Sequence, residues 1–240
     1  MSVTPTKAMV LAAGLGLRMR PLTDKMPKPL VPVAGQALLD HVLDKLAAAG
    51  VTEAVVNVHY LGEQIIDHVA GRSRPRVVIS DEREQVLGTG GGVVKALPLL
   101  GEGPFYHVNS DTMWIDGVRS NLVRLAECFD PARMDILLLM APTATSIGYS
   151  GPGDYTMLAD GALRKRRENQ VVPFVYAGAA VMSPSIFAGA PSGEFSLTRM
   201  FDRANEQERL FGLRLDGVWM HVGTPDAVSA AEEAFLESVA

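Results

Sequence analysis

Short apolar segments alternate with amphipathic ones through the first 140 residues, and this alternation restricts the fold more than any other feature of the chain. The apolar segments cover residues 8–13, 54–58, 76–80, 105–109 and 136–140, and helical patterns occupy residues 38–49, 62–70, 91–100 and 118–129. Short apolar strands separated by helices form a mainly parallel sheet that is covered on both faces. We therefore predict one Rossmann-like α/β domain over residues 1–240, with a mixed, mainly parallel sheet flanked by helices.

The second half of the chain is less regular, but three of its segments have a clear pattern. Residues 147–154 are rich in Gly, Ser and Pro and predict a loop, whereas residues 171–182 predict a strand. Thr224, Pro225 and Asp226 predict the start of the last helix, because Thr caps a helix, Pro fits its first turn and an acid suits its positive end. We expect this last helix to pack onto the body.

Composition and charge narrow the class of protein. The 240 residues are 48% hydrophobic and 20% charged, as in a globular chain, and the net charge is −5 with no long basic run. We expect no nucleic-acid or anionic-membrane partner, since both need concentrated positive charge. The single cysteine, Cys128, excludes an intrachain disulfide and a Cys-rich metal site. Residues 1–7 lack a signal-peptide pattern and no apolar run reaches about 20 residues, so we expect a cytoplasmic protein.

A glycine-rich loop follows the first predicted strand, where an α/β sheet opens its ligand crevice. Gly14 and Gly16 allow the backbone to approach phosphate oxygens closely. Arg18 can bind phosphate through its forked guanidinium, and Lys28 adds a point charge. The alternative is a tight turn that leads into an irregular surface segment. Met19 stands where a dinucleotide-binding loop has its third glycine, and the loop also lacks the Gly-Lys-Ser/Thr ending of a P-loop.

This loop resembles the signature of sugar-1-phosphate nucleotidyltransferases. Residues 14–30 have the pattern Gly-x-Gly-x-Arg-x-x-Pro-Leu-Thr-x-x-x-Pro-Lys-Pro-Leu, and further family motifs occur in the expected order at residues 87–92, 109–111, 176–178 and 219–225. The resemblance extends from about Lys7 to about Phe235. The short chain and the sequence Leu-Gly-Thr-Gly-Gly-Gly are most similar to the branch that acts on N-acetylmuramate 1-phosphate with UTP, in the peptidoglycan recycling of Gram-negative bacteria.

The resemblance implies a glycosyltransferase-A-like fold and an in-line reaction without a covalent intermediate. The sugar 1-phosphate would attack the α-phosphorus of UTP, and pyrophosphate would leave. Residues 7–110 would form the nucleotide-binding half and residues 111–240 the sugar-phosphate-binding half. Arg18 and Lys28 would hold the triphosphate and the leaving pyrophosphate. The remaining nucleotide contacts would come from Leu11, Ala12, Gly14, Gly16, Glu82, Gly88 and Thr89, with Glu82 accepting the N3–H of uracil.

The segment from Gly88 to Gly92 has two interpretations. Its backbone could lie against a flat base and ribose at the start of a helix, which is what the family resemblance implies. Alternatively, it is a flexible helix start, because glycine destabilises helices. In the family context we favour the nucleotide contact.

A magnesium site is predicted at Asp111, which follows the fourth apolar strand directly and therefore lies at the carboxyl end of the sheet. An ionised carboxylate suits Mg²⁺, which takes oxygen ligands and retains waters and phosphate oxygens. Asp116 is a second candidate, or the start of the next helix. His221 stands where the family usually has Asp. Since imidazole is a poor ligand for Mg²⁺, we expect His221 near the metal but not firmly coordinated to it.

The sugar-phosphate contacts are predicted at Asn109, Lys165, Tyr176 and Gly178. The family often has Glu-Lys-Pro near residue 165, with its Lys on the sugar phosphate, and this motif is absent here. Either Lys165 or Arg166 could replace it, with one of the two facing the crevice, because successive residues of a strand point to opposite faces. The alternative is a solvated edge strand that its charges protect. For Tyr176 and Gly178 the alternative to a sugar pocket is core packing.

Three other functions remain to be weighed. The first is a thymidylyl- or guanylyltransferase acting on a hexose or heptose 1-phosphate, since few residues change the base or the sugar. The second is a nucleotide-sugar-binding regulatory module without catalysis, which His221 favours and which Arg18, Lys28 and Asp111 oppose. The third, an NAD-dependent oxidoreductase, lacks the third loop glycine and an acidic residue after the second strand. Neither motifs nor composition indicate an oligomeric state.

Overall fold

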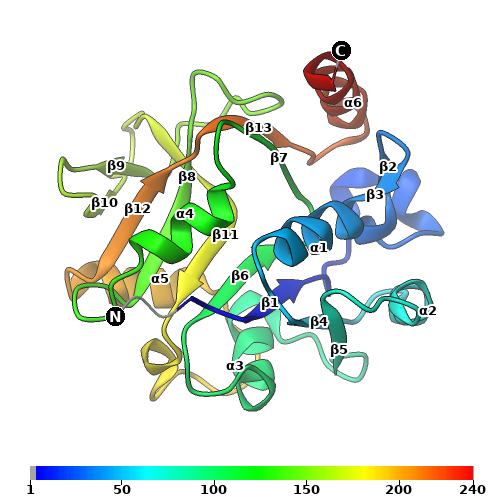
Figure 1. Cartoon of the computed structure of the whole chain (residues 1–240), viewed down its shortest axis with the longest axis horizontal. Helices are drawn as coiled ribbons and strands as arrows, with labels where there is room; N and C mark the ends of the chain where they lie inside the picture. The colour runs from blue at the N-terminus through cyan, green and yellow to red at the C-terminus, as the bar shows by residue number, and fades with distance from the viewer. Residues whose placement is uncertain (1–3, 240) are drawn as a thin grey trace.

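A mixed sheet runs through the centre of the molecule, with helices on both of its faces (Figure 1). The computed structural model describes residues 4–239, so residues 1–3 of the N-terminal segment discussed above lie outside it. Within residues 4–239 the sheet has nine strands: β1 (Lys7–Leu11), β4 (Glu53–Val58), β5 (Arg76–Asp81), β6 (Phe105–Asn109), β8 (Ile136–Pro142), β9 (Tyr155–Met157), β10 (Leu163–Lys165), β11 (Phe174–Met182) and β12 (Leu210–Arg214).

The strand order places a parallel unit beside an antiparallel one. The order is β10-β9-β11-β6-β1-β4-β5, and β8 pairs with both β11 and β12. Strands β6, β1, β4 and β5 are parallel, and β12 is parallel to β8, whereas β11 is antiparallel to β6, β8 and β9. The predicted α/β fold with a mixed, mainly parallel sheet is confirmed.

The remaining elements surround this sheet. Two small sheets pair β2 (Pro32–Val33) with β3 (Gln36–Ala37), and β7 (Thr112–Asp116) with β13 (Gly217–His221). The helices are α1 (Leu38–Ala48), α2 (Gly62–Val69), α3 (Gly88–Leu100), α4 (Asn121–Cys128), α5 (Thr198–Glu206) and α6 (Pro225–Val239). Single 3-10 turns occur at Leu17–Met19, Leu22–Asp24, Lys28–Leu30 and Pro184–Phe187. None of the helices within residues 4–239 has the length and apolar character needed to cross a membrane.

The core has two layers because successive side chains of a strand point to opposite faces. Ala8 and Val10 of β1 pack with α1, α2 and α4, whereas Met9 packs on the other face with α3 and α5. All three are fully buried. Burial on both faces explains why the central strands are apolar without alternation.

The region after Asp111 differs from the prediction. The helix predicted from Val118 begins at Asn121, after the cap residue Ser120, and Val118 is 97% exposed. Residues 112–116 instead form β7, which the sequence did not indicate because β7 pairs with β13, about 100 residues later. Helix α3 begins at Gly88 rather than at Gly91.

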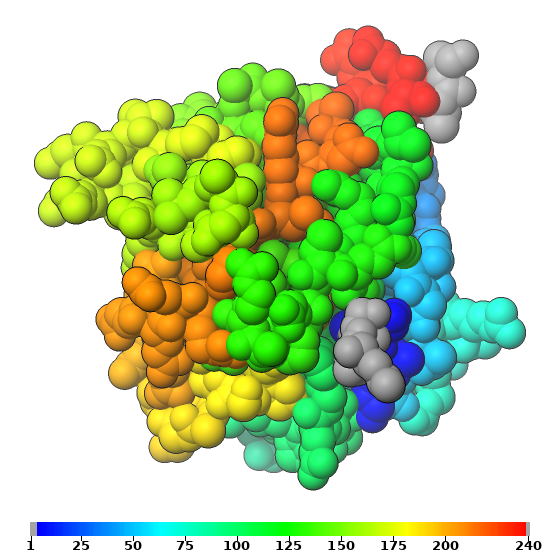
Figure 2. Space-filling model, turned by 60° about the vertical axis from the view of Figure 1, so that its left-hand side comes forward, coloured from blue at the N-terminus to red at the C-terminus, as the bar shows by residue number. Residues whose placement is uncertain are grey.

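The last helix packs onto the body, as predicted. Ala231 is buried in a third small cluster together with Met19 of the N-terminal loop and Met220 of β13, and Val228 and Phe235 pack against that cluster. Figure 2 shows α6 in red at one end of the molecule, near the orange segment that includes β13. Through this cluster, the C-terminal helix α6 packs beside the glycine-rich loop.

Candidate active site

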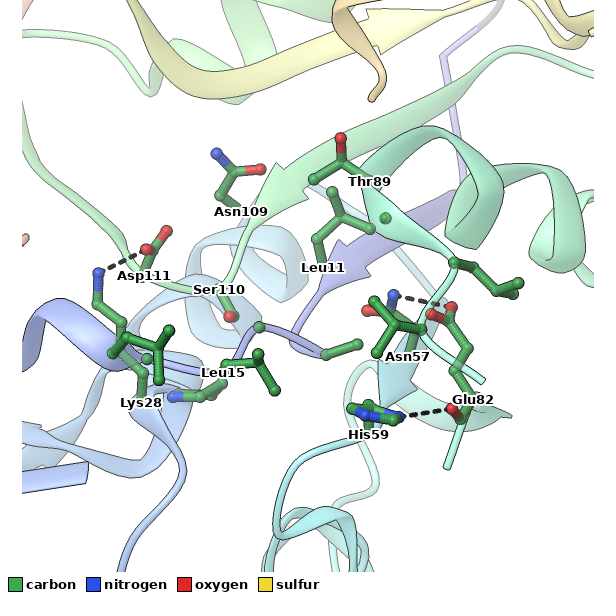
Figure 3. Close-up of a pocket in the computed structure, with 18 of the residues that line it drawn as sticks. Leu11, Leu15, Lys28, Asn57, His59, Glu82, Thr89, Asn109, Ser110 and Asp111 are labelled. Atoms are coloured by element: carbon green, nitrogen blue, oxygen red, sulfur yellow. Dashed lines mark hydrogen bonds and ion pairs between the residues drawn. The ribbon is translucent and has the colours of Figure 1, made fainter. Parts of the chain in front are cut away.

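The carboxyl ends of three parallel strands form the base of one cavity. Leu11 of β1 is in register with Asn57 of β4 and with Asn109 of β6. The cavity above them has a volume of about 530 Å³ (Figure 3). Ten of the predicted site residues line it: Leu11, Gly14, Gly16, Arg18, Lys28, Glu82, Gly88, Thr89, Asn109 and Asp111. Residues that lie up to 100 positions apart in the sequence therefore share one surface.

The glycine-rich loop is held by Gly16 rather than by Gly14. Gly16 has φ +65°, and a Cβ there would lie 3.1 Å from Cγ2 of Thr23 and 3.3 Å from Cβ of Lys28. The Thr23 hydroxyl donates to the Gly16 carbonyl at 2.8 Å. Gly14 has no atom within 4 Å of the position of a Cβ. Gly16 is thus required by the turn, whereas Gly14 leaves open space beside the cavity.

The cationic end of the cavity contains an ion pair. Lys28 Nζ lies 2.7 Å from Oδ2 of Asp111, and the Lys28 side chain is only 11% exposed, against 38% for Asp111 (Figure 3). The Arg18 side chain is exposed at the same end. The loop cation and the strand-end carboxylate that the sequence predicted separately therefore lie in direct contact.

The opposite end of the cavity contains a buried carboxylate. Glu82 is 2% exposed, and its Oε1 accepts a hydrogen bond from Nδ2 of Asn57 at 2.9 Å. The ring of His59 bonds the Glu82 backbone carbonyl through Nδ1 at 2.7 Å. Burial raises the pKa of the Glu82 carboxyl, while the hydrogen bond from Asn57 and the charges of Lys95 and His59 act to lower it. Asn57 and His59 were not predicted as site residues.

Ala12 lies behind this arrangement rather than on the cavity surface. Its backbone N–H donates to Oδ1 of Asn57 at 2.7 Å, and the residue is 2% exposed. Ala12, which was predicted to contact the nucleotide, therefore lies behind Asn57, and its backbone N–H is already bonded to the Asn57 side chain.

The glycines of α3 allow a close approach between distant segments. A Cβ on Gly90 would lie 2.3 Å from the Phe195 ring, and one on Gly91 would lie 2.2 Å from the Gly193 carbonyl oxygen. A Cβ on Gly88, which has φ +65°, would lie 2.8 Å from the Phe195 carbonyl oxygen. The Thr89 hydroxyl accepts from the Leu197 N–H at 2.8 Å. These contacts fix the helix start, which the alternative interpretation took to be flexible.

Two of the predicted sugar-phosphate residues, Lys165 and Tyr176, line a second cavity of about 190 Å³. Lys165 pairs with Asp202, with 2.5 Å between Nζ and Oδ1. The Tyr176 hydroxyl lies 3.0 Å from Nδ1 of His107. Burial raises the pKa of Tyr176 and lowers that of His107 to about 3, so both are neutral. Arg166 lines the same cavity, so the strand-alternation argument did not separate it from Lys165.

Gly178 lines neither cavity and lies at an irregularity of β11. The pairing of β11 with β8 shifts register between Tyr176 and Ala180, and Gly178 has φ +83° there. A Cβ on Gly178 would lie 3.0 Å from Cβ of Thr112 and 3.2 Å from Nδ2 of Asn109. The space that this glycine leaves is therefore occupied by the side chains of Thr112 and Asn109.

His221 lies among the charged residues of the cationic end. In β13 it pairs with Thr112, the residue that follows Asp111. Burial lowers the pKa of His221, the charges of Lys28 and Arg18 lower it further, and Asp111 raises it. The neutral imidazole is therefore favoured. Across residues 4–239, no group of three or more His, Cys, Asp and Glu side chains could hold a metal ion.

Asp116 has a structural role in the turn before α4. Its carboxylate accepts hydrogen bonds from Lys45 at 2.6 Å, from the Trp114 indole at 2.8 Å and from the Asn121 backbone and side chain at 2.8 Å. Burial alone would raise the pKa of Asp116, but these hydrogen bonds and the Lys45 charge lower it below its usual value. Asp116 therefore does not start the helix: it ends β7, and its carboxylate accepts hydrogen bonds from Asn121, the first residue of α4.

Comparison with known proteins shows the family to which this chain belongs. Residues 7–149 match the family described as nucleotidyl transferase. The chain belongs to the nucleotidyltransferase family. The chain is 47% identical to the N-acetylmuramate alpha-1-phosphate uridylyltransferase of Caulobacter vibrioides, over 99% of this chain and 100% of that protein. It is 35% identical to the protein of the same name from Neisseria meningitidis, over 91% of this chain and 93% of that protein.

Solved structures confirm the fold of this nucleotidyltransferase. A crystal structure of UDP-glucose pyrophosphorylase complexed with UDP-glucose superposes with a TM-score of 0.76, covering 97% of this chain and 98% of the other at 16% identity. The family match and the two sequence relatives confirm the family predicted from the loop signature, and the enzyme class with it.

Proposed function

We propose that this nucleotidyltransferase joins UTP to a sugar 1-phosphate, with N-acetylmuramate 1-phosphate as the preferred sugar, and releases pyrophosphate. Two relatives at 47% and 35% identity carry the corresponding name. The observation that carries the proposal is the polarity of the cavity, with Arg18 and Lys28 at one end and buried Glu82 at the other. A nucleoside triphosphate has the same polarity, because its phosphates are anionic and its base is a neutral hydrogen-bonding ring.

The residues present suit a reaction that depends on positioning and charge neutralisation. The new bond forms between a phosphate oxygen of the sugar 1-phosphate and the α-phosphorus, and the bond to the bridging oxygen breaks. Arg18 and Lys28 stabilise the negative charge that develops on the leaving pyrophosphate. No protein nucleophile is required.

Asp111 fits a magnesium ion that is held largely by its substrates. Mg²⁺ usually takes one or two carboxylates and completes its octahedral shell with phosphate oxygens and water. Asp111 supplies one carboxylate beside the cationic end, and His221 supplies a neutral imidazole that suits Mg²⁺ poorly. When bound, the ion would neutralise phosphate charge. We assign Asp111 as its ligand, with His221 adjacent.

We further propose that the two halves of the chain bind different substrates. Residues 7–110 bind the nucleotide, with Gly88 and Thr89 beside the base and Glu82 accepting the uracil N3–H. Residues 111–240 bind the sugar phosphate through Lys165 and Tyr176, together with Asn109 at the end of β6. Gly178 acts indirectly, by leaving the space that the side chains of Thr112 and Asn109 occupy. The presence of Lys165 and Tyr176 in the wall of the same second cavity supports a shared role in sugar-phosphate binding. We place this reaction in the cytoplasm.

The test is pyrophosphate release by the purified protein with Mg²⁺, each of four nucleoside triphosphates and a panel of sugar 1-phosphates. Release that requires UTP and N-acetylmuramate 1-phosphate is the expected result. Release with thymidine or guanosine triphosphate and a hexose or heptose 1-phosphate would replace the substrate assignment. No release from a folded protein that binds nucleotide would instead indicate the regulatory module.

A further inference from the structure

Asn57 has a fixed orientation, although its amide oxygen and nitrogen are similar in shape. The Ala12 backbone N–H can only donate, and it lies 2.7 Å from one amide atom of Asn57. That atom must be the acceptor Oδ1, so the other is the donor Nδ2. Nδ2 lies 2.9 Å from Oε1 of Glu82. One backbone N–H therefore determines the direction of both hydrogen bonds.

The pair is enclosed tightly enough to hold this orientation. Asn57 and Glu82 are each 2% exposed. Gly92 of α3 passes so close that a Cβ there would lie 2.8 Å from both Nδ2 of Asn57 and Oε1 of Glu82. The Glu82 backbone is held separately by His59. Helix α3 thus limits the movement of both side chains on one side, and the hydrogen bond from Asn57 holds the Glu82 carboxylate in place in the cavity wall.

This arrangement leaves one carboxylate oxygen for a ligand. Oε1 of Glu82 is occupied as an acceptor by Asn57, whereas Oε2 takes no hydrogen bond from the described residues 4–239 and is not fully enclosed. Glu82 and Asn57 both line the cavity at the end opposite Lys28 (Figure 3). Oε2 is therefore available as an acceptor in the cavity.

We infer that Asn57 is a positioning residue that selects uracil over cytosine, by holding Glu82 so that its free carboxylate oxygen meets the base as an acceptor. Uracil presents N3–H, a donor, at this edge, whereas cytosine presents a bare N3 with a lone pair. An acceptor fixed in the cavity therefore binds uracil and repels cytosine. Without Asn57, Glu82 can rotate or carry a proton towards the base, and the discrimination falls. This inference rests on the proposed use of UTP.

The test compares UTP with CTP in wild type, Asn57→Leu and Asn57→Ser. Leu has the shape of Asn without its hydrogen bonds, and Ser keeps one small polar group. The matched control is Ser80→Ala, because Ser80 pairs with Asn57 across β4 and β5, is also buried, and does not line the cavity. Both kcat/KM for pyrophosphate release and the affinities for UDP and CDP by calorimetry are measured.

We expect the UTP-to-CTP ratio of kcat/KM to fall by at least about tenfold in the Asn57 variants, since a hydrogen bond to a charged group is involved. The fall should come mainly from a higher KM for UTP, with the KM for the sugar phosphate unchanged. The UDP-to-CDP affinity ratio should fall in parallel, and Ser80→Ala should keep both ratios. If Asn57→Leu does not fold, the same two ratios measured for Asn57→Ser test the inference.

The outcomes separate the inference from the proposed function. A folded Asn57 variant with the wild-type preference for UDP would overturn the inference alone. Loss of that preference in a protein that releases no pyrophosphate would support the inference and contradict the proposed function. A wild-type protein that binds UDP no better than CDP would contradict both.

Discussion

The close contact between Gly90 and Phe195 predicts that Gly90→Ala lowers the free energy of unfolding. Helix α3 starts next to the cavity, and the Gly90 N–H donates to the Phe195 carbonyl at 2.8 Å. In Gly90→Ala the new Cβ would lie 2.3, 2.5 and 2.8 Å from three carbons of the Phe195 ring. Because Phe195 is only 6% exposed, the ring has little space into which to move.

Two opposing terms set the size of the effect. Overpacking of a buried site costs about 1–3 kcal/mol, whereas Ala in place of Gly in a helix gains up to about 1 kcal/mol. We therefore expect Gly90→Ala to lower the free energy of unfolding by about 1–2 kcal/mol. Phe195→Ala removes the ring at a cost of about 3–5 kcal/mol and leaves space for the methyl group. Adding Gly90→Ala to that variant should then be neutral or stabilising by up to about 1 kcal/mol.

The assay is urea unfolding of the wild type, the two single variants and the double variant. The expected coupling energy is about 2 kcal/mol, within the range for residues in contact. Gly71→Ala is the control, because a Cβ at Gly71 has no atom within 4 Å and its φ is not left-handed. Additive effects, within about 0.5 kcal/mol, would refute the claim that the glycine is required by the aromatic ring.

Four further outcomes are expected. Arg18→Ala should lower turnover by about 100-fold or more without changing the unfolding midpoint, because its side chain is exposed; a near-wild-type rate would remove its role. Asp111→Asn should raise the Mg²⁺ concentration needed for half-maximal rate, and an unchanged titration would contradict the metal assignment. His221→Asp should keep or raise the Mg²⁺-supported rate, whereas loss of the folded state would indicate a structural role. Asp116→Asn should destabilise the protein by about 1–3 kcal/mol at pH 7, measured by urea unfolding. Because the folded pKa of Asp116 lies below its usual value, this difference should be present above pH 4 and disappear as the pH falls through the lowered pKa; a pH-independent difference would contradict this account.

The sequence by itself determined the features that depend on local pattern. The apolar run of β1 is buried on both faces, and so identifies a central parallel strand without any knowledge of its neighbours. Gly16 and Arg18 follow that strand within a few residues, so their place at the carboxyl edge was implied by the strand. Asp111 follows β6 in the same way. These local relations sufficed for the fold and for the place of Arg18 and Asp111, whereas the family and the remaining predicted cavity residues came from the resemblance of the sequence motifs.

Only the tertiary structure decided which distant residues meet. The register of β1 with β4 brings Ala12 beside Asn57, and the pairing of β4 with β5 brings Glu82 within reach of the same amide. Likewise, the glycines of α3 are explained by Phe195, about 100 residues later. A local sequence pattern specifies burial and backbone preference, but a side-chain hydrogen bond or a steric contact depends on the packing of separate elements. That packing gave Asn57 its orientation, which the residue type alone leaves undetermined.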